Sequence, residues 1–149
     1  MTTGSDSVGE LRDLVALGCR IFGATGHDDF VWGHVSARDP GGRGVWMKAA
    51  SFGFEEITAE QIILVGFDGE VLVGDSPRHS EWPIHTEIMR ARPDVGGVVH
   101  SHPPHSIALG GPRRWSSDEE ALRKRETVWA ERHLSMLWEY LARRLQTGW

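Results

Sequence analysis

The sequence predicts an α/β fold whose sheet is not purely parallel. A helical pattern of apolar residues spans residues 8–22 near the start of the chain. Two apolar stretches, 62–67 and 71–73, flank Asp68-Gly69, a dipeptide that tolerates the positive φ of a tight hairpin turn. Strands joined by a hairpin run antiparallel, so helices combined with this hairpin exclude a sheet that is parallel throughout.

The first half of the chain divides into a helix and several extended stretches. Residues 30–38 are expected to be extended as far as the turn at 39–42, and residues 45–47 to form a strand that returns from it. The opening helix is predicted because its apolar residues recur at helical spacing. These residues are Leu11, Leu14, Val15, Gly18 and Phe22.

The second half contains a helix, a strand and a long terminal helix. Proline suits a first helical turn, so Pro83 predicts a helix over residues 83–92 that Pro93 closes. Residues 98–102 predict a strand, which Pro103 must end because proline cannot donate to a β-ladder. Ser117 and Glu120 then form a capping-box pattern, and the apolar residues beyond it share one helical face. These are Leu134, Leu137, Trp138, Leu141 and Leu145.

Composition excludes several classes of protein. A length of 149 residues suits one domain, and 40% hydrophobic with 25% charged residues is typical of a folded, soluble chain. The net charge of −5 leaves no basic surface for nucleic acid. We expect neither a signal peptide nor a membrane span, since no basic-apolar leader and no run of eighteen apolar residues occurs. A single cysteine, Cys19, suits a reducing compartment, so a cytoplasmic location is expected.

The segment Val98-Val99-His100-Ser101-His102 contains two histidines separated by one residue. Side chains of a strand alternate between its faces, so His100 and His102 are expected on the same side, roughly 7 Å apart at the backbone. Two such imidazoles can bind one divalent ion, with metal–nitrogen distances of about 2.1 Å. Such a pair alone is more often a surface feature without metal, so the metal interpretation depends on its context.

That context resembles the class II aldolase/adducin family. The stretch HSEWPIHTEIMRARPDV, followed by GGVVHSH, has this family's acid before a helix, its ARPDV run and its HxH strand. GHVS at 33–36 and FEEIT at 54–58 resemble its glycine loop and the region that follows. The likeness covers about residues 8–112, and a helical tail from about 115 to 149 resembles the end of some members. It implies one domain over 1–149, with three α/β/α layers and a mixed, largely antiparallel central sheet.

The resemblance also implies a metal site and a reaction. Carried over to this sequence, it makes His100 and His102 ligands of a divalent ion and Glu81 the general acid/base. Zinc is expected, although manganese, iron or cobalt fits such ligands nearly as well. On the residues alone, Glu81 could equally be a carboxylate placed at a helix start by the helix dipole. The implied partner is a small carbonyl or hydroxy-acid substrate.

Further residues are candidates for substrate binding. Gly33, Ser51 and Ser80 occupy family positions near the substrate. His34 stands where the aldolases often have asparagine, and could contact substrate or make a structural hydrogen bond. His105 could line the same pocket or lie in solvent, while His85 is expected to pack or cap.

Two departures from the family pattern affect the prediction. The phosphate-binding pairs of sugar-phosphate aldolases, threonine-glycine and serine-serine, are replaced by Ala50-Ser51 and His79-Ser80, so a non-phosphorylated hydroxy- or oxo-acid is expected. The family's long block after the HxH strand, with its third metal histidine, is missing between Pro112 and Trp115. Either the gene has an internal deletion or the block is absent from this sequence. His105, His133, Glu81 or a neighbouring subunit would then complete the metal shell.

Several functions fit these features. The first is a metal-dependent lyase of aldolase type that cleaves a C–C bond through an enediolate. The same site could instead support epimerisation, decarboxylation or iron-dependent oxygenation. A non-catalytic interaction module, as in adducin, or an inactive remnant would also account for the sequence. The resemblance and the apolar face of the terminal helix together predict a homo-oligomer, specifically a tetramer.

Overall fold

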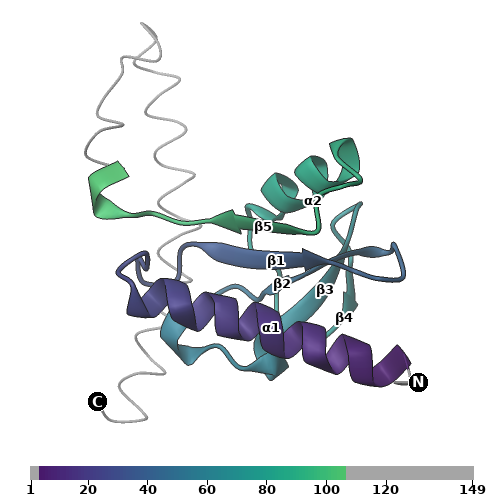
Figure 1. Ribbon diagram of the computed structural model, residues 1–149, viewed down its shortest axis with the longest axis horizontal. Helices are drawn as coiled ribbons and strands as arrows, with labels where there is room; N and C mark the ends of the chain where they lie inside the picture. Colours follow the sequence, from purple (N-terminus) through teal and green to yellow (C-terminus); the bar gives the residue numbers. More distant parts are fainter. Residues whose placement is uncertain (1–3, 107–149) are drawn as a thin grey trace, which may run out of the picture.

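A computed structural model describes residues 4–106 of the chain as a five-stranded sheet between two helices (Figure 1). The strands lie in the order β4-β3-β2-β1-β5, and every pairing between them is antiparallel. The expected terminal helix and its capping box lie outside the described residues. The elements in chain order are α1 (Gly4–Ala24), β1 (His34–Arg38), β2 (Gly44–Lys48), two 3-10 turns, η1 (Phe54–Glu56) and η2 (Ala59–Gln61), then β3 (Ile62–Gly66), β4 (Val71–Val73), α2 (Trp82–Ala91) and β5 (Gly97–His100).

The sheet has an apolar layer on each face, because alternate residues of a strand point to opposite sides. On one face, Trp46 and Leu64 pack with Cys19 of α1. On the other face, Met47 packs with Met89 of α2. The three-layer α/β/α architecture is therefore confirmed. Neither helix in the described part is long and apolar enough to cross a bilayer.

The two helices predicted within residues 4–106 and the hairpin are confirmed. The tight turn between β3 and β4 contains Gly69 at φ +90°, and the amide of Gly69 donates to the Gly66 carbonyl at 2.9 Å. Pro83 lies in the first turn of α2, where its missing N–H costs no helical hydrogen bond. The opening helix is longer than expected.

Two predicted strands are shorter than expected. The stretch 30–38 is extended only in β1, because Phe30 has a φ of 53° and Asp29 bridges to Trp32 in a tight turn. The second is β5, which ends before His102. Its core contact is also limited, because Val98 is buried but Val99 is 46% exposed.

The HxH strand also ends early, at His100 rather than at 102. Within residues 4–106 the only strand paired with β5 is β1, whose first residue, His34, is the cross-strand partner of His100. Before His34, Gly33 turns the backbone away at φ +84°, and a Cβ there would lie 2.8 Å from the Phe54 ring. His102 therefore has no strand partner and lies just beyond the ladder.

The turn between β1 and β2 is stabilised by a buried carboxylate. Asp39 is 1% exposed and accepts hydrogen bonds from Arg43 Nε at 2.8 Å and from Trp46 Nε1 at 2.9 Å. The hydrogen bonds from Arg43 hold the pKa of the Asp39 carboxyl at about 2, against burial, which acts to raise it. Because the folded-state pKa is depressed, this contribution to stability is present above about pH 4 and is lost as the pH falls toward 2.

We therefore expect Asp39→Asn to lower the free energy of unfolding by about 2 kcal/mol at pH 7, the usual worth of hydrogen bonds to a charged group. The difference from the wild type should shrink between pH 4 and pH 2. Urea unfolding at both ends of this range measures it. Asp94→Asn, at an exposed Asp–Arg pair, is the matched control and should change little. An equal loss in both variants would contradict the role assigned to Asp39.

Candidate metal centre

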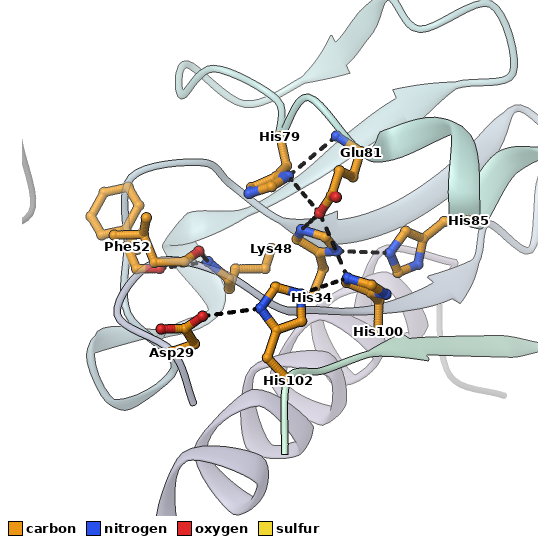
Figure 2. A network of polar contacts seen from close by, with 10 residues as sticks. Asp29, His34, Lys48, Phe52, His79, Glu81, His85, His100 and His102 are labelled. Carbon is orange, nitrogen blue, oxygen red and sulfur yellow. Dashed lines mark hydrogen bonds and ion pairs between the residues drawn. The ribbon is translucent and has the colours of Figure 1, made fainter. Parts of the chain in front are cut away.

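Four imidazoles and one carboxylate meet where β1 begins and β5 ends, beside the loop that leads into α2 (Figure 2). The sheet register positions the first pair, because His34 and His100 are directly opposite on β1 and β5. Their rings are stacked, with centroids 5.3 Å apart and an interplanar angle of 14°. The antiparallel pairing of these two edges therefore places one histidine beside the other.

Glu81 faces this group of imidazoles. It is the N-cap residue of α2, yet its side chain makes no capping hydrogen bond. Instead its Oε2 lies 3.4 Å from His34 Nε2, 3.7 Å from His100 Nε2 and 3.9 Å from His79 Nδ1. Glu81 is thus directed at the histidines rather than used as a helix-start carboxylate. We name these five residues (His34, His79, Glu81, His100, His102) the imidazole cluster.

His100 and His102 converge although only the first lies in the strand. Their Nε2 atoms are 2.9 Å apart, and the Nδ1 of His102 lies 3.2 Å from the Asp29 carboxylate. A carboxylate oxygen can only accept, so His102 donates its Nδ1–H to Asp29, and the Nε2 side of its ring is the side that could bind a metal. Metal-binding histidines are commonly oriented by such a carboxylate. Burial also lowers the pKa of His100, which favours the neutral ring that binds metal.

His34 is buried completely at the centre of the cluster. Burial, reinforced by the neighbouring imidazoles of His79 and His85, holds the pKa of His34 well below its usual range, so the ring is neutral. Its Nε2 and the Oε2 of Glu81 are buried atoms that form no hydrogen bond with any described residue. Donor atoms bound to one tetrahedral ion at about 2.1 Å lie about 3.4 Å apart, which is the separation seen here. The cluster therefore fits a divalent cation.

His79 is a site residue that the sequence motifs do not indicate. It is buried, and its ring packs against those of Trp32 and His34, with centroids 5.8 and 3.9 Å away. Donor atoms of His34, His79 and Glu81 all lie within 4.8 Å of one another, a spacing that could hold a metal. However, His79 Nδ1 already accepts the backbone N–H of Glu81 at 3.2 Å. This hydrogen bond fits a residue that orients Glu81 better than a ligand through Nδ1.

The remaining candidates lie in varied surroundings. Ser51 is buried at a left-handed φ of 66°, whereas Ser80 and His105 are exposed. Within residues 4–106 no hydrogen bond links these three to the cluster. Gly33 contributes its backbone turn, and His85 packs in the interior as expected. The substrate roles of Gly33, Ser51, Ser80 and His105 stay predictions.

Comparisons with known proteins agree with this architecture. The profile of the "Class II Aldolase and Adducin N-terminal domain" matches residues 13–137. The chain is 35% identical over 113 residues to a 3,4-dihydroxyphthalate decarboxylase from Arthrobacter keyseri, a match that covers 65% of this chain and 42% of that protein.

Solved structures show the same fold. An L-fuculose 1-phosphate aldolase from Glaciozyma antarctica PI12 is similar with a TM-score of 0.66 and 31% identity, over 75% of this chain and 49% of that one. An aldolase II superfamily protein from Pseudomonas syringae is similar with a TM-score of 0.63 and 30% identity, over 70% and 43% of the two chains. The chain spans about half the length of these relatives or less. Because the profile matches most of its length, the chain belongs to the class II aldolase and adducin family.

Proposed function

We propose that the protein is a divalent-metal-dependent lyase that cleaves or forms a C–C bond in a small hydroxy- or oxo-acid or aldehyde without a phosphate group. The observation that supports this most strongly is the proximity of His34 and His100 to Glu81, with His102 directly beside His100. Neutral imidazoles beside a carboxylate form a set of ligands suited to zinc, manganese, iron or cobalt, and we propose zinc.

The roles of the residues follow from their surroundings. His100 and His102 would hold the ion, and Asp29 would orient the ring of His102. The ion supplies Lewis-acid stabilisation of negative charge on a substrate oxygen. Glu81 has a side chain that is 34% exposed, so it is accessible to a substrate while one oxygen faces the imidazoles. This carboxylate would move a proton at the carbon next to the breaking bond.

The chemistry around the cluster favours a substrate without phosphate. The first position of the serine pair found in sugar-phosphate aldolases is filled by the buried ring of His79, and the second, Ser80, is exposed. The nearby buried ammonium of Lys48 donates to the backbone carbonyls of Val31 and Phe52. Only one hydroxyl of the serine pair remains and the Lys48 ammonium is directed at backbone carbonyls, so fewer of the donors that a phosphate dianion needs are available.

Decarboxylation is the second candidate reaction, because the curated relative at 35% identity is a decarboxylase of an aromatic dihydroxy diacid. Aldol cleavage and decarboxylation both break a C–C bond and leave electrons on a carbon next to an oxygen that a cation can stabilise. The same cluster would serve both, so the reaction type would be decided by the part of the site that binds the leaving fragment.

A direct assay tests this proposal. Purified protein, stripped of metal and reloaded with Zn²⁺, Mn²⁺, Fe²⁺ or Co²⁺, is incubated with non-phosphorylated hydroxy-acids, their phosphorylated counterparts and carboxylated catechols, while aldehyde and carbon dioxide release are followed. We expect metal-dependent cleavage of at least one non-phosphorylated compound. Faster cleavage of the phosphorylated counterparts would overturn the substrate class. No cleavage with any of the four metals would overturn the lyase assignment.

We also propose that the chain self-associates, as a tetramer, in the cytoplasm. Leu14, Leu17 and Ile21 lie three and four residues apart along α1 and are 62%, 46% and 53% exposed, on the side of α1 away from the core. A contiguous apolar stripe of this kind favours association. Light scattering coupled to size exclusion should give the mass of four chains. A monomer mass at micromolar concentration would contradict it.

A further inference from the structure

We propose that His34 supplies a third imidazole ligand, and that a hydrogen-bonded relay through His85 and Ser36 fixes its tautomer for this role. The inference rests on the proposed metal site. It assigns the third histidine to β1, within the described part of the chain, rather than to the block that is missing after the HxH strand. His85 and Ser36 would be positioning residues that act through His34.

The relay begins at a backbone carbonyl. Ser36 Oγ lies 3.4 Å from the Val98 oxygen and 2.7 Å from His85 Nδ1. A carbonyl can only accept, and a serine hydroxyl has one proton, so a hydroxyl that donates to Val98 accepts from His85. In this arrangement His85 carries its proton on Nδ1.

The next hydrogen bond follows from the first (Figure 2). A neutral imidazole has one protonated nitrogen, so His85 Nε2 is an acceptor. It lies 3.2 Å from His34 Nδ1, which must then be the donor. His34 Nε2 is left with a bare lone pair and faces Glu81 Oε2, while the His34 ring stacks beside that of His100.

The opposite direction fits the structure less well. If Ser36 donated to His85 Nδ1 and His85 Nε2–H donated to His34 Nδ1, the proton of His34 would be on Nε2. This Nε2–H would face the Glu81 carboxylate and should donate to it. The two atoms are 3.4 Å apart, yet both lack a hydrogen-bond partner among the described residues. Two buried acceptors facing each other repel unless a cation lies between them, which is the situation that the proposed relay direction produces.

The residues that orient His34 are uncharged, whereas the residue that orients His102 is a carboxylate. Asp29 is a carboxylate and is partly exposed, whereas His85 and Ser36 are buried and uncharged. A buried carboxylate behind His34 would be costly without a permanent counter-ion. A neutral relay fixes the same ring orientation without that cost, so both β1 and the 101–102 segment direct an Nε2 atom into the imidazole cluster.

Nitrogen NMR of the unmutated protein tests the tautomers directly. Long-range ¹⁵N–¹H spectra of the metal-free protein at about pH 8, where free histidine is neutral, are expected to show protonated Nδ1 and bare Nε2 in both His34 and His85. Adding Zn²⁺ should shift Nε2 of His34, His100 and His102 and leave His85 protonated at Nδ1. A protonated Nε2 on His34, or no shift of its signal with Zn²⁺, would overturn the inference.

A matched pair of variants provides a second test. Ser36→Ala removes the acceptor of the His85 Nδ1–H, so the relay should lose its direction and Zn²⁺ affinity should fall about 10- to 100-fold. Ser101→Ala removes a hydroxyl from another serine–histidine contact, to His27 Nδ1 at 3.3 Å, and should leave the affinity unchanged. Equal affinities in the two variants would contradict the relay. If the wild type binds Zn²⁺ while His34 does not respond, this inference fails and the proposed function stands; if the wild type binds no Zn²⁺, both fail.

Discussion

Glu81→Gln should reduce turnover by about 10²- to 10⁴-fold, the usual worth of general acid–base catalysis, while the metal stays bound. Glutamine keeps the shape of the side chain but cannot accept or release the proton. In the structure the carboxylate is close enough to three imidazoles to interact with a bound ion, yet its side chain is also accessible. Turnover and metal content measured on the same sample therefore separate the two roles.

Glu87→Gln is the matched control, because Glu87 lies on α2 but is exposed and pairs with Arg90. It should retain full turnover. If Glu81→Gln instead loses its metal together with its activity, Glu81 is a ligand and the division of roles is wrong. Retained turnover in Glu81→Gln would exclude proton transfer by this carboxylate.

Replacing His100 or His102 with alanine should lower the affinity for a divalent ion at least about tenfold. Each imidazole is one of few donors, so losing one removes a large part of the binding free energy. Equilibrium dialysis against Zn²⁺ followed by elemental analysis measures this affinity. Asp29 offers a graded comparison, since Asp29→Asn keeps the ring of His102 but weakens its orientation and should cost less.

His27→Ala is the control for these variants, because its ring packs on Phe22 and hydrogen-bonds Ser101 outside the cluster. It should bind Zn²⁺ as the wild type does. Unchanged metal affinity in both His100→Ala and His102→Ala would remove the basis for the assigned ligands.

Much of the fold could be predicted because its signals are local. The helices follow from apolar spacing and proline positions, and the hairpin follows from Asp68-Gly69. The lengths of the strands were less predictable, because a strand ends where its partner ends. The backbone turn at Gly33 ends the pairing of β1 with β5, and β5 therefore ends at His100. Nothing near His102 in the sequence indicates this turn.

The candidate site was predicted in part. The structure brings together Glu81, His100 and His102, which the family motif indicated, although their roles stay predictions. His34 was expected only to make substrate or structural contacts, because its place opposite His100 depends on the β1–β5 register. In the sequence, His79 was noted only because it replaces the first serine of the phosphate-binding pair of sugar-phosphate aldolases. A histidine two residues before the acid was an available signal, since it lies within hydrogen-bonding reach of the Glu81 amide.

The most direct test of the metal centre is elemental analysis of the purified protein, performed together with its intact mass after dialysis against Zn²⁺. We expect one divalent ion per chain, retained through gel filtration and absent from a double variant with alanine at His100 and His102. A folded wild-type protein that retains no ion, or a double variant that retains as much as the wild type, would contradict it.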